Sequence, residues 1–208
     1  LGSRGLGDVY KRQVETSHKE ISKVENNGHA MAPYMMSVGL YVTCLAFALM
    51  YPIRHGIKKA ENALKYWASK ATVMYTVSTL AAIAMVTALR LINGFEPVNL
   101  GLTYLLAILV SAAFMSLVML LSLTTGFIGD FLLLVFMIIN LGGSAGTYPL
   151  DTGPAIYKAI HKFVPYTYSV DGFRKTISMT APSLSVEFAV FAGILIVCSI
   201  LTLSLIHI

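Results

Sequence analysis

The chain has 208 residues, of which 56% are hydrophobic and 12% are charged. Because a typical soluble domain carries roughly 25% charged residues, these charges are too few to cover a surface that faces water. The high hydrophobic fraction excludes intrinsic disorder, and two cysteines, Cys44 and Cys198, are too few for a disulfide scaffold. The net charge of +5 is small, and we expect a lipid bilayer, not nucleic acid, as the partner of the basic segments.

The two ends of the chain differ in character from the rest. Residues 1–13, LGSRGLGDVYKRQ, lack the apolar core and the cleavage site of a signal peptide. They look like a translated sequencing adapter, as do residues 204–208, SLIHI. We therefore expect both ends to be non-native tails, with a genuine flexible tail as the alternative, and residues 14–30 to be the end of an extracellular region.

Long apolar runs predict a five-span membrane domain over residues 31–203. The first run, Met31 to Tyr51, has 21 residues and no charge, which at 1.5 Å per residue is enough to cross about 30 Å of hydrocarbon. Between Glu96 and Asp151 there is one charge, Asp130, in a run too long for a single helix, so we expect two spans joined by a turn. The predicted spans are 31–51, 71–92, 101–123, 127–146 and 186–203. The predicted fold class is an all-α integral membrane protein.

The distribution of Lys and Arg predicts the orientation. The connection between the first two spans has one acid, Glu61, and five cations, which are Arg54, Lys58, Lys59, Lys65 and Lys70. We place it in the cytoplasm, so residues 14–30 and the long segment 142–184 lie outside. The outer segment also carries four cations, but Asp151 and Asp171 offset them.

The same connection has apolar residues at helical spacing from Ile53 to Ala68, with lysines on the other side and a Glu61–Lys65 pair. This pattern predicts a cytoplasmic amphipathic helix on the membrane surface. It is either an orientation anchor or a coupling helix that receives force from a soluble partner. The candidate partner-coupling residues are Arg54, Lys58, Lys59, Lys65 and Trp67.

The segment between the fourth and fifth spans predicts a pair of short helices, in a re-entrant or interfacial hairpin. Small residues allow close approach of membrane helices, prolines interrupt the chain, and Asp171 with Gly172 suggests a second turn. The candidate helix-packing and re-entrant motif consists of Gly142, Gly143, Gly146, Pro149, Pro165, Asp171, Gly172 and Arg174.

Motifs for catalysis are absent from the sequence. It contains no phosphate loop, no H-E-x-x-H and no G-x-S-x-G, and its five histidines lie far apart and outside the predicted spans. We therefore expect no enzymatic activity, no cofactor and no metal site. Asp130 and Glu187 are interpreted as residues that stabilise helix starts, and Arg90 as an anchor whose guanidinium reaches the headgroups.

Several strings carry a resemblance to a known family. The segment from Asn140 to Met179 resembles the closing signature of the YhgE/Pip (phage infection protein) family, through LGGS at 141–144, GTYP at 146–149, VPYTY at 164–168 and DGFR at 171–174. Residues 31–42 resemble the start of that family's membrane block. The chain departs from the pattern at Asp171 and Ala145, where relatives often carry Asn and Gly. More distantly, the arrangement is similar to ABC-2 type transporter permeases.

The resemblance implies a longer parent protein with an upstream extracellular domain, in the cell membrane of a Gram-positive bacterium. One implied function is a permease-like domain of an export or secretion system, in which two such blocks form a path and a separate ATPase subunit supplies the energy. The other is a non-transporting membrane scaffold for an extracellular receptor or a type VII secretion accessory domain.

Overall fold

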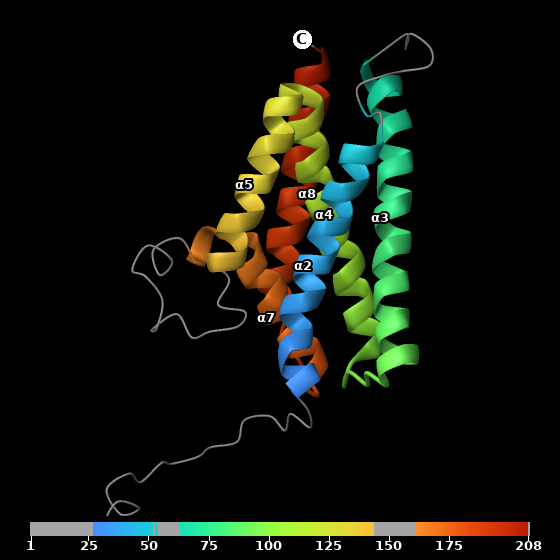
Figure 1. The fold of residues 1–208 in the computed structure, drawn as a ribbon, viewed down its shortest axis with the longest axis vertical. Coiled ribbons are helices and arrows are strands. Elements are labelled where there is room, and N and C mark those ends of the chain that lie inside the picture. Colours follow the sequence, from blue (N-terminus) through green and yellow to red (C-terminus); the bar gives the residue numbers. More distant parts are fainter. Residues whose placement is uncertain (1–26, 52, 54–62, 144–160, 208) are drawn as a thin grey trace, which may run out of the picture.

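The computed structural model describes residues 27–51, 53, 63–143 and 161–207, and over these residues the chain is helical with no strand. This confirms the predicted all-α fold. The helices lie side by side, and successive helices alternate in direction except α7, which continues in the direction of α5 (Figure 1). They are α2 (Asn27–Met50), α3 (Ala63–Asn93), α4 (Leu100–Thr125), α5 (Phe127–Gly143), α7 (Pro165–Ser178) and α8 (Ser185–His207), with a single 3-10 turn, η2, at His161–Phe163.

Four of these helices are long and apolar enough to cross a membrane: Met31–Met50, Leu64–Asn93, Leu100–Thr125 and Ser185–Leu205. They correspond to the first, second, third and fifth predicted spans. In place of the fourth predicted span, 127–146, there is a shorter apolar helix over Phe127–Gly142, and residues 144–146 lie outside the described part of the chain. Figure 1 shows that α5 descends part of the way along the bundle and that α7 continues to its lower end.

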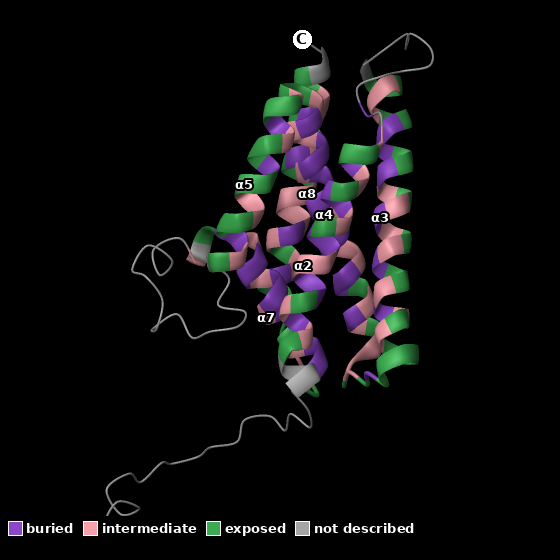
Figure 2. Ribbon diagram, viewed as in Figure 1, coloured by how far each residue is buried: buried purple, intermediate pink, exposed green. Residues whose placement is uncertain are grey.

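Helix α4 is the centre of the bundle and packs against α2, α3, α5, α7 and α8. Its buried residues include the small side chains of Ala107, Ser111, Ala113 and Ser116, which let neighbouring helices approach closely. Figure 2 shows the buried residues concentrated on α4 and on the faces of other helices turned toward it. The outward faces of α3, α5 and α8 carry large exposed apolar side chains, as expected where lipid is the solvent.

Hydroxyl groups join the helices within the apolar bundle. Ser111 Oγ donates to the carbonyl of Ser78 at 3.0 Å, which ties α4 to α3. The hydroxyls of Thr87 and Tyr104 make a second α3–α4 contact at 2.8 Å. Because α3 descends while α4 ascends, these two pairs align the helices, and they place Arg90 level with the start of α4.

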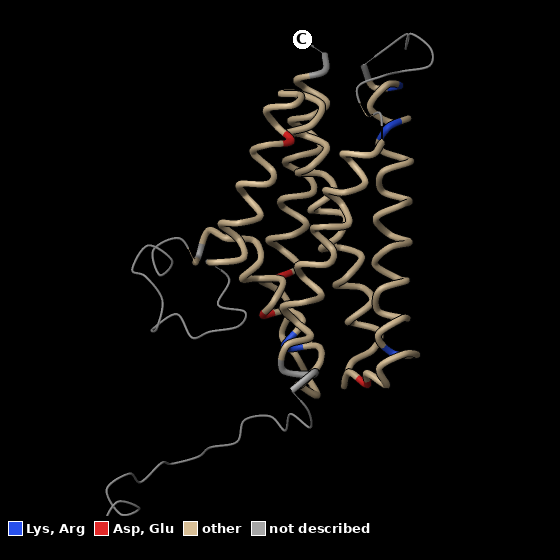
Figure 3. The backbone as a smooth tube through the Cα atoms, viewed as in Figure 1, with Lys and Arg blue, Asp and Glu red and all other residues tan. Residues whose placement is uncertain are grey.

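The length of α3 indicates where a bilayer would lie along the bundle. Nineteen uncharged residues separate Lys70 from Arg90, a rise of about 30 Å and therefore the thickness of a hydrocarbon core. Figure 3 shows the basic residues of α3 near its two ends. The whole helix has 31 residues, or about 46 Å, so it extends beyond Lys70 by about two turns. Residues 64–70, predicted as part of a separate amphipathic helix, are therefore the first turns of the second span, and residues 54–62 lie outside the described residues.

A tight turn joins α4 to α5. Gly126 has a positive φ of 69°, which a residue without a Cβ adopts at low cost. A Cβ on Gly129 would collide with the Leu121 carbonyl and the Thr125 hydroxyl. Asp130, predicted to accept from free amides at the start of α5, accepts a hydrogen bond from Ser122 Oγ at 2.6 Å and so ties α5 back to the end of α4.

Candidate functional site

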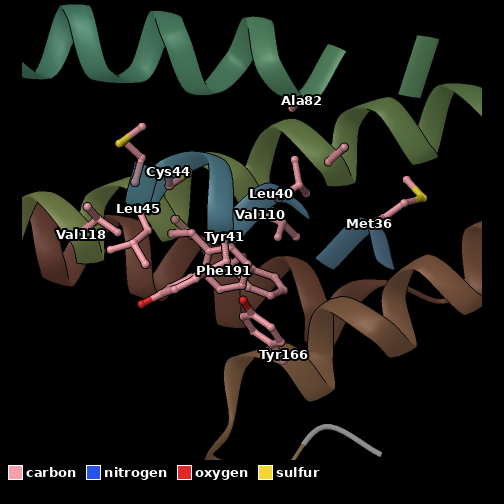
Figure 4. Packing of buried hydrophobic residues seen from close by; sticks show 14 of the residues in the cluster. Met36, Leu40, Tyr41, Cys44, Leu45, Ala82, Val110, Val118, Tyr166 and Phe191 are labelled. Atoms are coloured by element: carbon pink, nitrogen blue, oxygen red, sulfur yellow. The ribbon is translucent and has the colours of Figure 1, made fainter. Parts of the chain in front are cut away.

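Aromatic side chains from five helices meet at the centre of the bundle, and Figure 4 shows three of them, Tyr41, Tyr166 and Phe191. Tyr41 of α2 lies edge-on to Phe114 of α4, with centroids 5.3 Å apart, and to Tyr166 of α7 at 5.6 Å. Phe114 also contacts Phe191 of α8 at 5.9 Å, and Tyr41 contacts Phe136 of α5 at 6.0 Å. Edge-to-face contacts of this kind add to the packing energy. This aromatic junction therefore links α7 to α2, α4, α5 and α8.

Two polar contacts fix α5 and α7 at the junction. The hydroxyl of Tyr41 donates to the carbonyl of Leu133 at 2.9 Å. The buried Asn140 side chain donates to the Phe136 carbonyl at 2.6 Å, and its Oδ1 accepts from the backbone amide of Tyr166 at 3.3 Å. That amide lies in the first turn of α7, where helix amides have no partner within the helix. Asn140 thus ties the end of α5 to the start of α7.

The predicted motif residues Pro165, Asp171, Gly172 and Arg174 all lie on α7. Pro165 is the first residue of the helix, a position that tolerates the missing amide. Asp171 and Gly172 were predicted to form a turn, and this prediction is wrong because both lie inside the helix. Asp171 and Arg174 form an exposed ion pair at 3.4 Å, one turn apart.

Gly172 lies where α7 meets α4 and α8. A Cβ at this position would be 2.8 Å from Cδ2 of Leu106 and 3.3 Å from Cγ of Glu187. Close packing, and not a bend of the backbone, therefore explains the glycine. The sequence predicted a helix-packing role for it, but nothing in the sequence indicated which helices it would face.

An ion pair joins α7 to α8 beside this contact. Lys175 Nζ lies 2.5 Å from Glu187 Oε1, and the side chain of Glu187 is only 4% exposed. Lys175 Nζ also donates to the carbonyl of Ser183 at 3.2 Å. Neither Lys175 nor Glu187 was a candidate in the sequence, because each resembles an ordinary charge near a helix end. A pairing across a loop between two helices leaves no local pattern.

The end of α7 is also held by the connection between α3 and α4. Backbone amides of Val98 and Asn99 donate to the carbonyls of Ile177 and Thr176 at 3.1 and 3.0 Å. The Asn99 side chain donates to the Met179 carbonyl at 2.5 Å. These bonds tie the end of α7 to the α3–α4 connection, at the lower end of the bundle in Figure 1.

At the opposite end, the buried Lys70 lies over the rings of two tyrosines. Its Nζ is 5.0 Å from the centroid of Tyr51 and 5.9 Å from that of Tyr66, within the range of a cation–π interaction. Of the predicted coupling residues, Lys65 is exposed and Trp67 packs against the core. Arg54, Lys58 and Lys59 lie outside the described residues.

The remaining motif residues fall at or beyond the end of α5. Gly142 and Gly143 are its last two residues, while Gly146 and Pro149 lie outside the described residues. Within the described part of the chain, no group of three His, Cys, Asp or Glu residues could hold a metal ion.

Comparison with known proteins agrees with this helical architecture. The family model for the ABC-2 family transporter protein matches residues 10–207, so the chain belongs to the ABC-2 family of transporter proteins. It is similar to the uncharacterized protein YhgE of Bacillus subtilis (strain 168), with 32% identity over 170 residues. The resemblance to YhgE in the sequence is thereby confirmed. The aligned part is 82% of this chain but 22% of YhgE. No solved structure shows significant similarity.

Proposed function

We propose that this chain is the permease block of a YhgE-type export or secretion system that is driven by a separate ATPase subunit. The observation that carries the proposal is the family match over residues 10–207, because ABC-2 permeases are membrane components that work with an ATPase. The sequence contains no phosphate-binding loop of its own. The chain would thus supply the path, and its partner the energy.

We infer that the bundle crosses the bilayer five times. Helices α4 and α8 run in the same direction (Figure 1), so the chain must return across the bundle between them. Helix α5 makes the first part of this return and α7 makes the last part. This supports a fourth crossing that is divided between two helices. The exposed apolar faces of α5 and α8 would contact lipid or a second copy of the chain.

The charges support an orientation with the Lys70 end in the cytoplasm of a Gram-positive cell. Lys65 and Lys70 belong to the described residues at that end, and Arg54, Lys58 and Lys59 lie between α2 and α3 in the sequence. At the other end, the cations of α7 are paired with acids. An excess of Lys and Arg in the cytoplasmic connections is typical of membrane proteins.

The partner-coupling role belongs to the protruding turns of α3 and the segment before them. Lys65 is exposed there, while Trp67 packs against the core, so a soluble partner could bind the basic side chains and displace the helix. The test is to purify the tagged full-length protein from its own host and to measure the ATPase activity that copurifies. A variant with Lys58→Glu, Lys59→Glu and Lys65→Glu should lose that activity, whereas Arg174→Glu at the opposite end should retain it. Equal activity in the triple variant would refute the coupling role.

A scaffold function is favoured by one observation, namely that 78% of YhgE lies outside the aligned part, since the alignment covers 22% of it. The membrane block could merely hold an extracellular receptor or secretion accessory domain. Replacing residues 31–203 in the full-length protein by an unrelated membrane anchor of the same orientation distinguishes the two functions. A scaffold retains secretion or phage adsorption after the exchange, and a permease loses it.

A further inference from the structure

The Lys175–Glu187 pair lies within the depth of the membrane. The α3–α4 hydrogen bonds place Arg90 level with the start of α4 at Leu100. Leu106 is six residues further along α4, or about 9 Å deeper. A Cβ on Gly172 would touch both Leu106 and Glu187, so Glu187 shares the level of Leu106. Glu187 is therefore about two helical turns inside the boundary that Arg90 marks, and Lys175 reaches it from nearer that boundary, since the carbonyl of the next residue, Thr176, accepts from the amide of Asn99.

The surroundings of Glu187 are dry, whereas the side chain of Lys175 is 32% exposed. Glu187 is 3% exposed, and its second carboxylate oxygen, Oε2, is buried with no hydrogen-bond partner among the described residues. Leu106, which a Cβ on Gly172 would contact together with Glu187, belongs to the hydrophobic core, as do Phe173 and Ile177 of α7. Charges in such a place are costly unless they are paired, and ionisable residues inside a membrane commonly serve a function.

Separation of α7 from α8 is therefore tied to the entry of water. While Lys175 contacts Glu187, the buried carboxylate is compensated and can stay dry. If the helices part, this carboxylate is left isolated at a depth where only water could solvate it, and a half-open dry state is strongly disfavoured. The pair thus permits two arrangements, one closed and dry, the other open and hydrated.

We propose that Lys175 and Glu187 form a latch that closes the outer side of the bundle, and that its release admits water between α7 and α8. Gly172 allows the approach that the latch needs, and the Ser183 carbonyl holds the lysine in place. This proposal depends only on the placement of the bundle in a membrane. It holds whether or not the chain binds an ATPase, and in the proposed permease the latch would be the outer gate.

The test measures access of a charged reagent to a buried reporter in α7. Thr176 is fully buried next to Lys175, so Thr176→Cys is introduced with Cys44→Ser and Cys198→Ala. The protein is placed in lipid nanodiscs, where both faces can be reached, and treated with a trimethylammonium methanethiosulfonate. Ala82→Cys, a fully buried position on α3, reports any general loosening of the bundle.

Glu187→Gln should raise the labelling rate at position 176 by about tenfold or more, since it leaves the lysine without a counter-charge. The exchange of both residues, Lys175→Glu with Glu187→Lys, should bring the rate back toward that of the parent. Asp171→Asn, which breaks the exposed ion pair of the same helix, should leave it unchanged.

Equal labelling of Glu187→Gln and the parent would overturn the latch, as would fast labelling of the exchanged pair. Increased labelling at Ala82→Cys would also overturn it, because the charge pair would then support the whole bundle and not one contact. If Glu187→Gln gives no monodisperse protein, the variant with Lys175→Glu and Glu187→Lys decides whether the latch exists. A folded, slowly labelled exchange variant supports the latch, and an unfolded one refutes it.

Discussion

Replacing Gly172 by alanine tests the close contact between α7, α4 and α8. The added Cβ would lie 2.8 Å from Leu106 and 3.3 Å from Glu187. Leu106 is fully buried, so its side chain has little room to move, and overpacking of this kind costs about 1–3 kcal/mol. The same change gains about 1 kcal/mol from the higher helix propensity of alanine. We expect a net change in the free energy of unfolding between about zero and 2 kcal/mol of destabilisation.

Gly193→Ala is the matched control, because nothing lies within 4 Å of a Cβ at this position in the interior of α8. It carries the propensity gain without the packing cost, so the two alanine variants should differ by about 1–3 kcal/mol. The chain has a single tryptophan, and Trp67 packs against the core, so its fluorescence follows unfolding in mixed micelles of increasing SDS content. Equal stability of the two variants would refute the packing argument for Gly172.

Three further changes test other contacts. Tyr41→Phe removes the hydroxyl that bonds α5 and should lower the free energy of unfolding by about 0.6 kcal/mol, and at most about 1.7, in the same SDS titration; a value near zero would show that the bond does not stabilise the fold. Gly129→Ala must displace backbone at the α4–α5 turn and should abolish the monodisperse peak in size-exclusion chromatography, whereas Gly101→Ala, with open space around its Cβ, should retain it; equal peaks would contradict the turn geometry. Lys70→Ala loses the contacts with two tyrosine rings and should lower the thermal midpoint through a loss of about 0.5–2 kcal/mol, while exposed Lys65→Ala should leave it within error; the reverse order would refute the buried site.

The candidate spans could be predicted from the sequence because lipid leaves the backbone few alternatives. Every amide inside a bilayer must find its partner within the helix or a closed barrel, so long uncharged runs specify helices directly. The described spans of α2, α4 and α8 lie within a few residues of the predicted ones. Helix α3 was predicted from residue 71, yet it begins at Ala63, because the lysines of its first turns were interpreted as a surface segment.

The candidate site could be predicted only in part, since its contacts join residues distant in the sequence. The sequence identified Gly172 as a helix-packing candidate because it is a glycine. It also predicted a turn at this position, where the structure has a continuous helix that packs against Leu106. Lys175 and Glu187 meet only because residues 179–184 bring α8 back alongside α7. The burial of Lys70 was missed for a similar reason, since the tyrosine rings that cover it come from two different segments.

The overlong α3 has a mechanical consequence. A continuous helix of 31 residues without an internal proline behaves as a stiff rod, and its serine contact with α4 at Ser78 lies near the middle. A sideways push on the turns around Lys65 would therefore act on α4 through two contacts, at Ser78 and, nearer Arg90, at Thr87. A force applied at one face of the membrane would thus reach the central helix of the bundle at two levels.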